Sequence, residues 1–81
     1  MKKVTYIKYL DSCLRDGEKP INHNFQPVVF EAVGFLVKED DDAVTLAREL
    51  NEIDGEENTR GTITIPKIAI QERYVFERKT V

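Results

Sequence analysis

Four consecutive carboxylates, Glu39 to Asp42, are the densest group of side chains in the sequence that could do chemistry. Adjacent residues of an extended chain point to opposite faces, so these carboxylates do not converge on one metal ion. The spaced oxygens of a calcium loop, D-x-D-x-D-G, are absent. A catalytic carboxylate pair must face across a cleft, which a continuous run does not achieve. Because apolar segments flank the run on both sides, the pattern indicates the solvated tip of a β-hairpin.

A second candidate group consists of Ser12, Cys13 and His23, which are the only serine, cysteine and histidine of the chain. A nucleophile and its base need a rigid scaffold and an oxyanion hole, but no nucleophile elbow or glycine-rich oxyanion segment is present. One cysteine and one histidine do not complete a structural zinc site. Glycine-rich phosphate loops are also absent. We therefore expect no enzyme, no catalytic residue, no metal and no cofactor.

The charges are strongly polarised along the chain. The overall net charge is −3, but residues 39–57 hold nine acids and one base, a net of −8, and the other residues carry a net of +5. An anionic partner is repelled by the middle of the chain and tolerated by its two ends. This distribution disfavours nucleic-acid binding through the central segment and leaves room for a small anionic ligand elsewhere.

The sequence indicates a cytoplasmic protein without a membrane segment. Lys2 and Lys3 precede a stretch that Lys8 interrupts and that has no signal-peptide cleavage site. The longest apolar stretch, residues 28–37, is too short to span a bilayer and contains Glu31. The single cysteine excludes an internal disulfide and favours a reducing compartment.

Hydrophobic periodicity predicts five strands, at residues 4–10, 28–38, 43–50, 62–65 and 69–78. Gly34 suggests a bulge or bend in the second strand. The third segment also fits helical spacing, and we favour a strand because two apolar runs around a short acidic tip form a hairpin. Between the strands we expect a long loop at 11–27, an acidic loop at 51–61 and one 3₁₀ turn after Pro66. In the last strand, Ile70, Tyr74 and Phe76 are expected to face inward.

These elements predict an all-β fold, a small SH3-like or Sm-like five-stranded barrel that forms one domain over residues 1–81. A chain of this size is only marginally stable alone, so we expect a homo-oligomer. Both faces of the first strand are largely apolar, which suits a strand covered by a core on one side and by a partner subunit on the other.

Binding residues are expected where strands end and loops begin. Asp11 and Ser12 form a turn or bond a ribose or base edge. Tyr9 packs in the core or stacks on a base, and Phe25 near the long loop is a second candidate for base stacking. Three cations suit a phosphate, Lys67 after Pro66, Arg60 beside Thr62, and Arg15 in the long loop. Solvated surface charges remain the alternative for these three.

Three segments, "YLDS" (residues 9–12), "VGFLVKEDDDAVTLA" (33–47) and "TITIPKIAI" (62–70), resemble a family of small phage and prophage proteins. Some small phage barrels of this kind are similar to anti-defence sponge proteins, which bind cyclic nucleotide immune signals without cleaving them. The resemblance implies a sponge that evades CBASS-type or Thoeris-type immunity. An Sm-like RNA-binding module and an acidic adaptor or inhibitor of a host enzyme are the alternatives.

Overall fold

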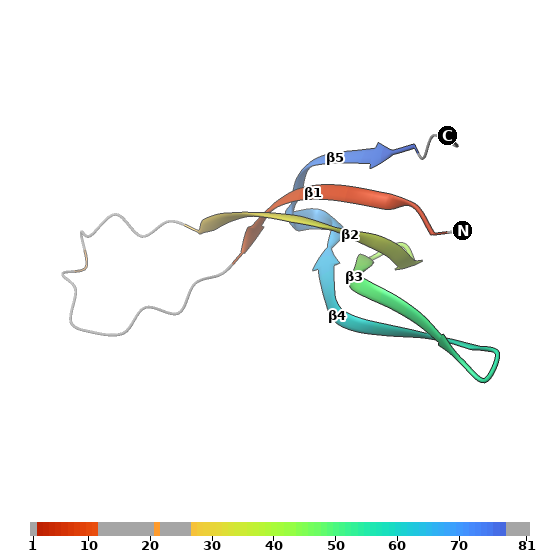
Figure 1. The fold of residues 1–81 in the computed structure, drawn as a ribbon. Coiled ribbons are helices and arrows are strands. Elements are labelled where there is room, and N and C mark those ends of the chain that lie inside the picture. The colour runs from red at the N-terminus through yellow and green to blue at the C-terminus, as the bar shows by residue number, and fades with distance from the viewer. Residues whose placement is uncertain (1, 12–20, 22–26, 78–81) are drawn as a thin grey trace.

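The computed structural model describes residues 2–11, 21 and 27–77, which form an all-β structure (Figure 1). Its elements are strands β1 (Val4–Asp11), β2 (Val28–Glu39), β3 (Ala43–Ile53), β4 (Glu56–Pro66) and β5 (Ile70–Phe76), with the 3₁₀ helix η1 (Lys67–Ala69) between the last two strands. The predicted strands and the 3₁₀ turn are therefore present. The ambiguous third segment is a strand, as expected.

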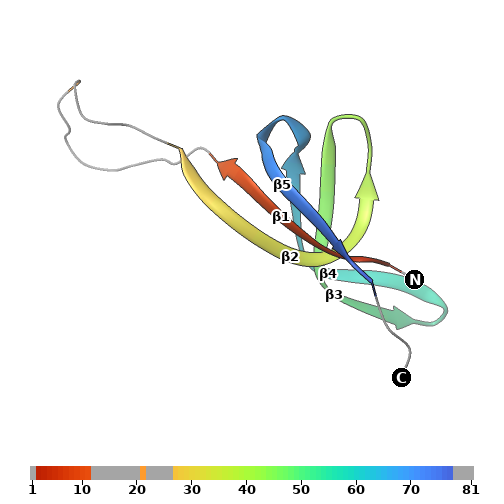
Figure 2. The same cartoon turned by 90° about the horizontal axis from the view of Figure 1, so that it is seen from above.

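The five strands form one antiparallel sheet in the order β4-β3-β2-β1-β5. The sheet curls strongly, and the curvature of β2 is plain in Figure 2. It is not closed, because no ladder joins its two outer strands, β4 and β5, within the described residues. The all-β fold class is confirmed, whereas a closed barrel is not shown.

The curl follows from the way in which β2 is shared between two neighbours. Its first part pairs with β1 and its last part with β3, and Phe35 has a partner on each side, Val4 and Ala47. Gly34 permits the close approach of β3, since a Cβ at this position would lie 2.8 Å from the carbonyl oxygen of Ala47. The sequence predicts a bulge or a bend at Gly34, and the β2–β3 ladder has its register shift close by, between Leu36 and Lys38.

The hairpin that joins β3 and β4 corrects one sequence prediction. Residues 51–61 are not an acidic loop, because strand pairing continues to Ile53 and Glu56 and leaves only Asp54 and Gly55 in the turn. Both turn residues have positive φ, 53° and 80°, as a tight hairpin turn requires. The second half of β3 and the first half of β4 (residues 49–53 and 56–60) thus form a two-stranded ribbon that projects beyond the rest of the sheet (Figure 1).

A small core lies on one side of the curled sheet. Ile7, Val44, Leu46 and Ile65 are fully buried and pack with Tyr9. The alternation of β1 produces this arrangement, because Thr5, Ile7 and Tyr9 face the core while the intervening side chains face outward. No helix in the described ranges has the length and apolar character needed to cross a membrane.

The facing of β5 differs from the sequence prediction. Ile70 pairs with Tyr9, but Glu72 pairs with Lys8, so Gln71 is an extra residue in the ladder. One extra residue moves every following side chain to the opposite face of a strand. Tyr74 and Phe76 are consequently exposed, at 58% and 52%, and the prediction that they face inward is wrong.

Candidate ligand-binding site

Three charged side chains meet where the end of β2 approaches η1 and β5. The guanidinium of Arg73 donates to both carboxylate oxygens of Glu39, at 2.7 Å and 3.0 Å. The Nζ of Lys67 lies 2.9 Å from Oε2 of the same carboxylate. We call these three residues, together with Pro66, the η1 corner. Two cations share one carboxylate there, so the group carries a net charge of +1.

The sheet register places these side chains on the core side. Glu39 pairs with the buried Val44, and Arg73 pairs with the buried Ile7. β2 and β5 are not neighbours, because β1 lies between them. The Glu39–Arg73 pair therefore spans the core side of the curled sheet and ties the end of β2 to β5. Sequence reasoning missed this contact because 34 residues separate the partners.

The side chains of the η1 corner are shielded from water only in part. The exposed fractions of the Glu39, Lys67 and Arg73 side chains are 33%, 36% and 30%. Hydrogen bonds from Arg73 and Lys67 lower the pKa of Glu39 from its ordinary value of 4.5 to about 2. The Glu39 carboxylate in turn raises the pKa of Arg73. Glu39 and Arg73 are charged at neutral pH, and Lys67 retains exposed surface through which it can meet a ligand.

Asp40, Asp41 and Asp42 of the acidic run form the exposed turn of the β2–β3 hairpin, as expected, whereas Glu39 is the last residue of β2 and pairs with Arg73 and Lys67. One oxygen of Asp40, Oδ1, accepts from the backbone N–H groups of Asp42 and Ala43, each at 2.9 Å. These two bonds lower the pKa of Asp40. The turn also contacts η1, since the backbone N–H of Lys67 donates to the carbonyl oxygen of Asp42 at 2.8 Å. The carboxylate of Asp40 thus has a local structural role.

We expect acid to weaken the fold partly through Glu39. Because its folded-state pKa lies below the ordinary value, its ion pairs stabilise the fold above about pH 4.5, and this stability is lost as pH falls towards 2. Between these two pH values, the melting temperature of the wild type should fall more steeply with pH than that of Glu39→Gln. Asp40 shifts in the same direction but is present in both proteins. Equal pH slopes for the two proteins would contradict this role of Glu39.

The structure places the predicted site residues at different depths. Tyr9 belongs to the core, with 7% exposure, and stacks on Phe30 with 5.8 Å between ring centroids. Asp11 is exposed at the end of β1. Because Tyr9 pairs with Ile70, the end of β1 runs beside the start of β5 and contacts η1. Asp11, Pro66 and Lys67 are therefore at the same end of the sheet.

The other predicted residues are not brought to this corner. Arg60 is on the projecting ribbon, where its NH1 lies 3.7 Å from Oε2 of Glu49. Thr62 is exposed and pairs with Ala47 in the middle of β3. Ser12 and Arg15 lie outside the described residues, as do Cys13, His23 and Phe25.

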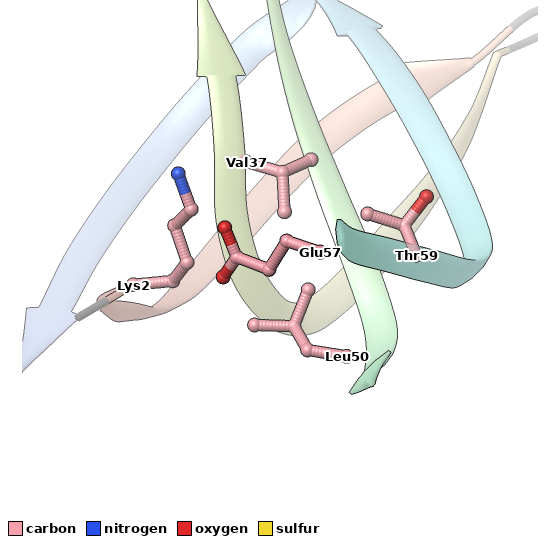
Figure 3. A pocket seen from close by; sticks show the side chains of 5 residues that line it. All are labelled: Lys2, Val37, Leu50, Glu57 and Thr59. Carbon is pink, nitrogen blue, oxygen red and sulfur yellow. The ribbon is translucent and has the colours of Figure 1, made fainter. Parts of the chain in front are cut away.

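A pocket of about 200 Å³ lies away from the predicted residues (Figure 3). The carboxylate of Glu57 points toward the side chain of Lys2 between Val37 and Leu50, and Thr59 lies on the far side of Glu57. Pockets that enclose drug-sized ligands measure about 300–1,000 Å³. This pocket is therefore too small for a cyclic dinucleotide. Within the described residues, no group of three or more metal-ligating side chains is present.

The geometry can hold an anionic group at the η1 corner by charge and hydrogen bonding. Lys67 offers a mobile ammonium group, and an incoming phosphate would compete with Glu39 for it. Comparison of the chain with protein-family models, with curated proteins and with solved structures gives no match.

Proposed function

We propose that this chain is a non-enzymatic phage protein that sequesters a small anionic ligand in the host cytoplasm. The ligand that we propose is a cyclic nucleotide immune signal, and the biological role is evasion of CBASS-type or Thoeris-type immunity. The curled five-stranded sheet with its β4-η1-β5 corner is interpreted as an SH3-like barrel, and the functional unit as a homo-oligomer.

The η1 corner carries this proposal. Lys67 and Arg73 share one carboxylate, so their excess positive charge can balance part of a phosphate. Asp11 and the end of β1 are at the same end of the sheet. Asp11 leads directly into a segment whose sequence contains Ser12 and Arg15. The carboxylate of Asp11 and the cations of Lys67 and Arg73 at this end match the ribose hydroxyls and the phosphates of a nucleotide.

The charge distribution supports a compact anion over a polynucleotide. The hairpin turn and the ribbon carry most of the acids of the chain, and a long nucleic acid bound at the η1 corner would meet this repulsion. A cyclic di- or trinucleotide can contact the corner without extending over the ribbon.

The experiment combines the release of bound ligand with direct titration. The protein purified from infected or expressing bacteria is heated, and the released small molecules are identified by mass spectrometry. In parallel, calorimetric titrations use cyclic di- and trinucleotides and cyclic ADP-ribose products. Lys67→Gln should weaken binding of the active ligand about tenfold or more, because a charge-assisted phosphate contact is lost. Lys38→Gln, which alters an exposed lysine of β2, is the matched control and should bind as the wild type does.

Two outcomes would overturn the proposal. One is the absence of any binding across the panel together with no released nucleotide. The other is equal binding by the wild type and by folded Lys67→Gln protein. The first outcome would favour the acidic adaptor function, since the ribbon presents exposed carboxylates of Glu49, Glu52, Asp54, Glu56 and Glu57.

A further inference from the structure

The outer side of strands β2, β1 and β5 presents a broad apolar surface. Val33, Tyr6 and Tyr74 are register partners across the three strands, and Phe35, Val4 and Phe76 form the adjacent row. We call these two rows the outer face. Val33 on β2 is 62% exposed, and the exposed rings of Tyr74 and Phe76 lie on β5, across β1 from it. The rings of Tyr6 and Tyr74 have their centroids 5.7 Å apart.

The area of the outer face matches the largest apolar patch that a typical monomer exposes, a kind of patch that is often functional. An aromatic side chain buries about 200 Å² when fully covered, so Tyr74 and Phe76 each present about 100 Å². With the aliphatic side chains, the two rows offer on the order of 500 Å². The largest apolar patch on a typical monomer is about 300–600 Å². Together with the charged row Glu31–Lys8–Glu72 that borders it, the face approaches the roughly 800 Å² per partner of a standard interface.

The buried core of the chain is small, so the fold needs further apolar burial, which covering the outer face would supply. Among the described residues, six apolar side chains are buried, whereas ten large apolar side chains are exposed, and three of these ten (Val33, Tyr74 and Phe76) belong to the outer face. A chain of 81 residues with one cysteine has no disulfide to compensate for this deficit. The partner that covers the outer face must be present wherever the chain folds. A second copy of the same chain meets this condition, while a different protein meets it only in some cells.

We propose that the outer face is the interface of a homodimer, in which the two three-stranded faces pack against each other. Sheets that pack face to face are about 10 Å apart and bury the side chains of both inner faces. The dimer would give β1 the two-sided burial that its sequence pattern indicates. The interface is on the side of the sheet opposite the core and does not depend on the identity of the ligand.

One polar group of the outer face is already satisfied. The hydroxyl of Tyr6 donates to Oε1 of Glu31 at 2.5 Å. This bond raises the pKa of Tyr6 to about 12, so the phenol remains neutral at physiological pH. Covering the ring by a second copy leaves no unpaired Tyr6 hydroxyl, whose burial would otherwise weaken the interface. The charged row lies at one border of the two apolar rows, where charges remain in contact with water.

The test is the mass of the full chain in solution as a function of concentration. Sedimentation equilibrium of the wild type should give a dimer at roughly 100 μM and dissociation on dilution. Val33→Lys places a charge in the most exposed apolar position of the face, on β2, and should raise the dimer dissociation constant at least about tenfold. Ile53→Lys is the matched control, since Ile53 is similarly exposed, at 59%, but lies at the end of the ribbon. This control should dimerise as the wild type does.

A second variant covers the case in which Val33→Lys does not fold. Tyr74→Trp introduces the only tryptophan of the chain, and its emission should shift to longer wavelengths on dilution as the face becomes exposed to water. A wild type that is monomeric at about 100 μM would overturn the proposal. So would a folded Val33→Lys dimer of unchanged affinity, or a tryptophan emission that is solvent-exposed at every concentration. Each of these results leaves the nucleotide proposal intact, because ligand binding is measured separately through Lys67.

Discussion

Gly34→Val is expected to lower the free energy of unfolding by about 3 kcal/mol. A Cβ at this position would lie 2.8 Å from the carbonyl oxygen of Ala47 and 3.1 Å from the Cβ of Leu46. Both contacts involve paired strand backbone or a fully buried side chain, so neither neighbour can move without disturbing the β2–β3 ladder. The branched valine adds two further methyl groups to this contact. Denaturant unfolding of both proteins at one fixed protein concentration measures the difference.

Gly55 provides the control for this substitution. It is in the β3–β4 turn, and a Cβ there meets nothing within 4 Å, although its φ is +80°. Asparagine tolerates this backbone conformation, so Gly55→Asn should change stability by less than about 1 kcal/mol. A Gly34→Val protein as stable as Gly55→Asn would show that β3 can move away from β2. In that case the close approach at Gly34 would not be what holds the curl of the sheet.

Ile7→Ala is the second substitution with a large expected effect, a loss of about 2–5 kcal/mol. Ile7 has no exposed surface and lies at the centre of β1, between Ala32 of β2 and Arg73 of β5. Truncation removes apolar burial and leaves a cavity in a core of very few side chains. Because small domains are only marginally stable, this loss would remove a large part of the total stability.

Ile68→Ala is the matched control, since Ile68 in η1 is 96% exposed. Its replacement should change stability by less than about 0.5 kcal/mol. The same pair of variants also examines the η1 corner, because Ile7 pairs with Arg73. We expect Ile7→Ala to lower the free energy of unfolding strongly at neutral pH. Its effect on the pH dependence of that free energy should be small. Equal melting temperatures for the two alanine variants would contradict the position of Ile7 at the centre of the core.

The strands themselves were accessible from local sequence patterns. Alternation in residues 4–10 predicted β1, and β-branched and aromatic residues predicted β2 and β5. The acidic tip was accessible because a run of carboxylates between apolar segments has no other favourable location. The extent of β4 was underestimated, since its polar residues 56–61 carry no apolar alternation and become a strand only by pairing with β3.

The candidate site was accessible only in part. Lys67 and Asp11 follow from their positions at strand ends, and both lie at the end of the sheet that the η1 corner occupies. Tyr9 was equally compatible with stacking on a ligand, and burial in the core decided its role. Arg73 gave no local signal, because a single arginine in a strand is compatible with either face until the register is known.

The sequence by itself determined the strand content, the hairpin turn at Asp40 and the polarised charge, because these properties depend on neighbouring residues. The tertiary structure decided which side chains share a face. The extra residue Gln71 turned Tyr74 and Phe76 outward, and the curl of the sheet brought Glu39 to Arg73 and Lys67. Register and curl arise from the packing of strands that are distant in the sequence. A shift of one residue reverses every side chain that follows it, and no local pattern contains that information.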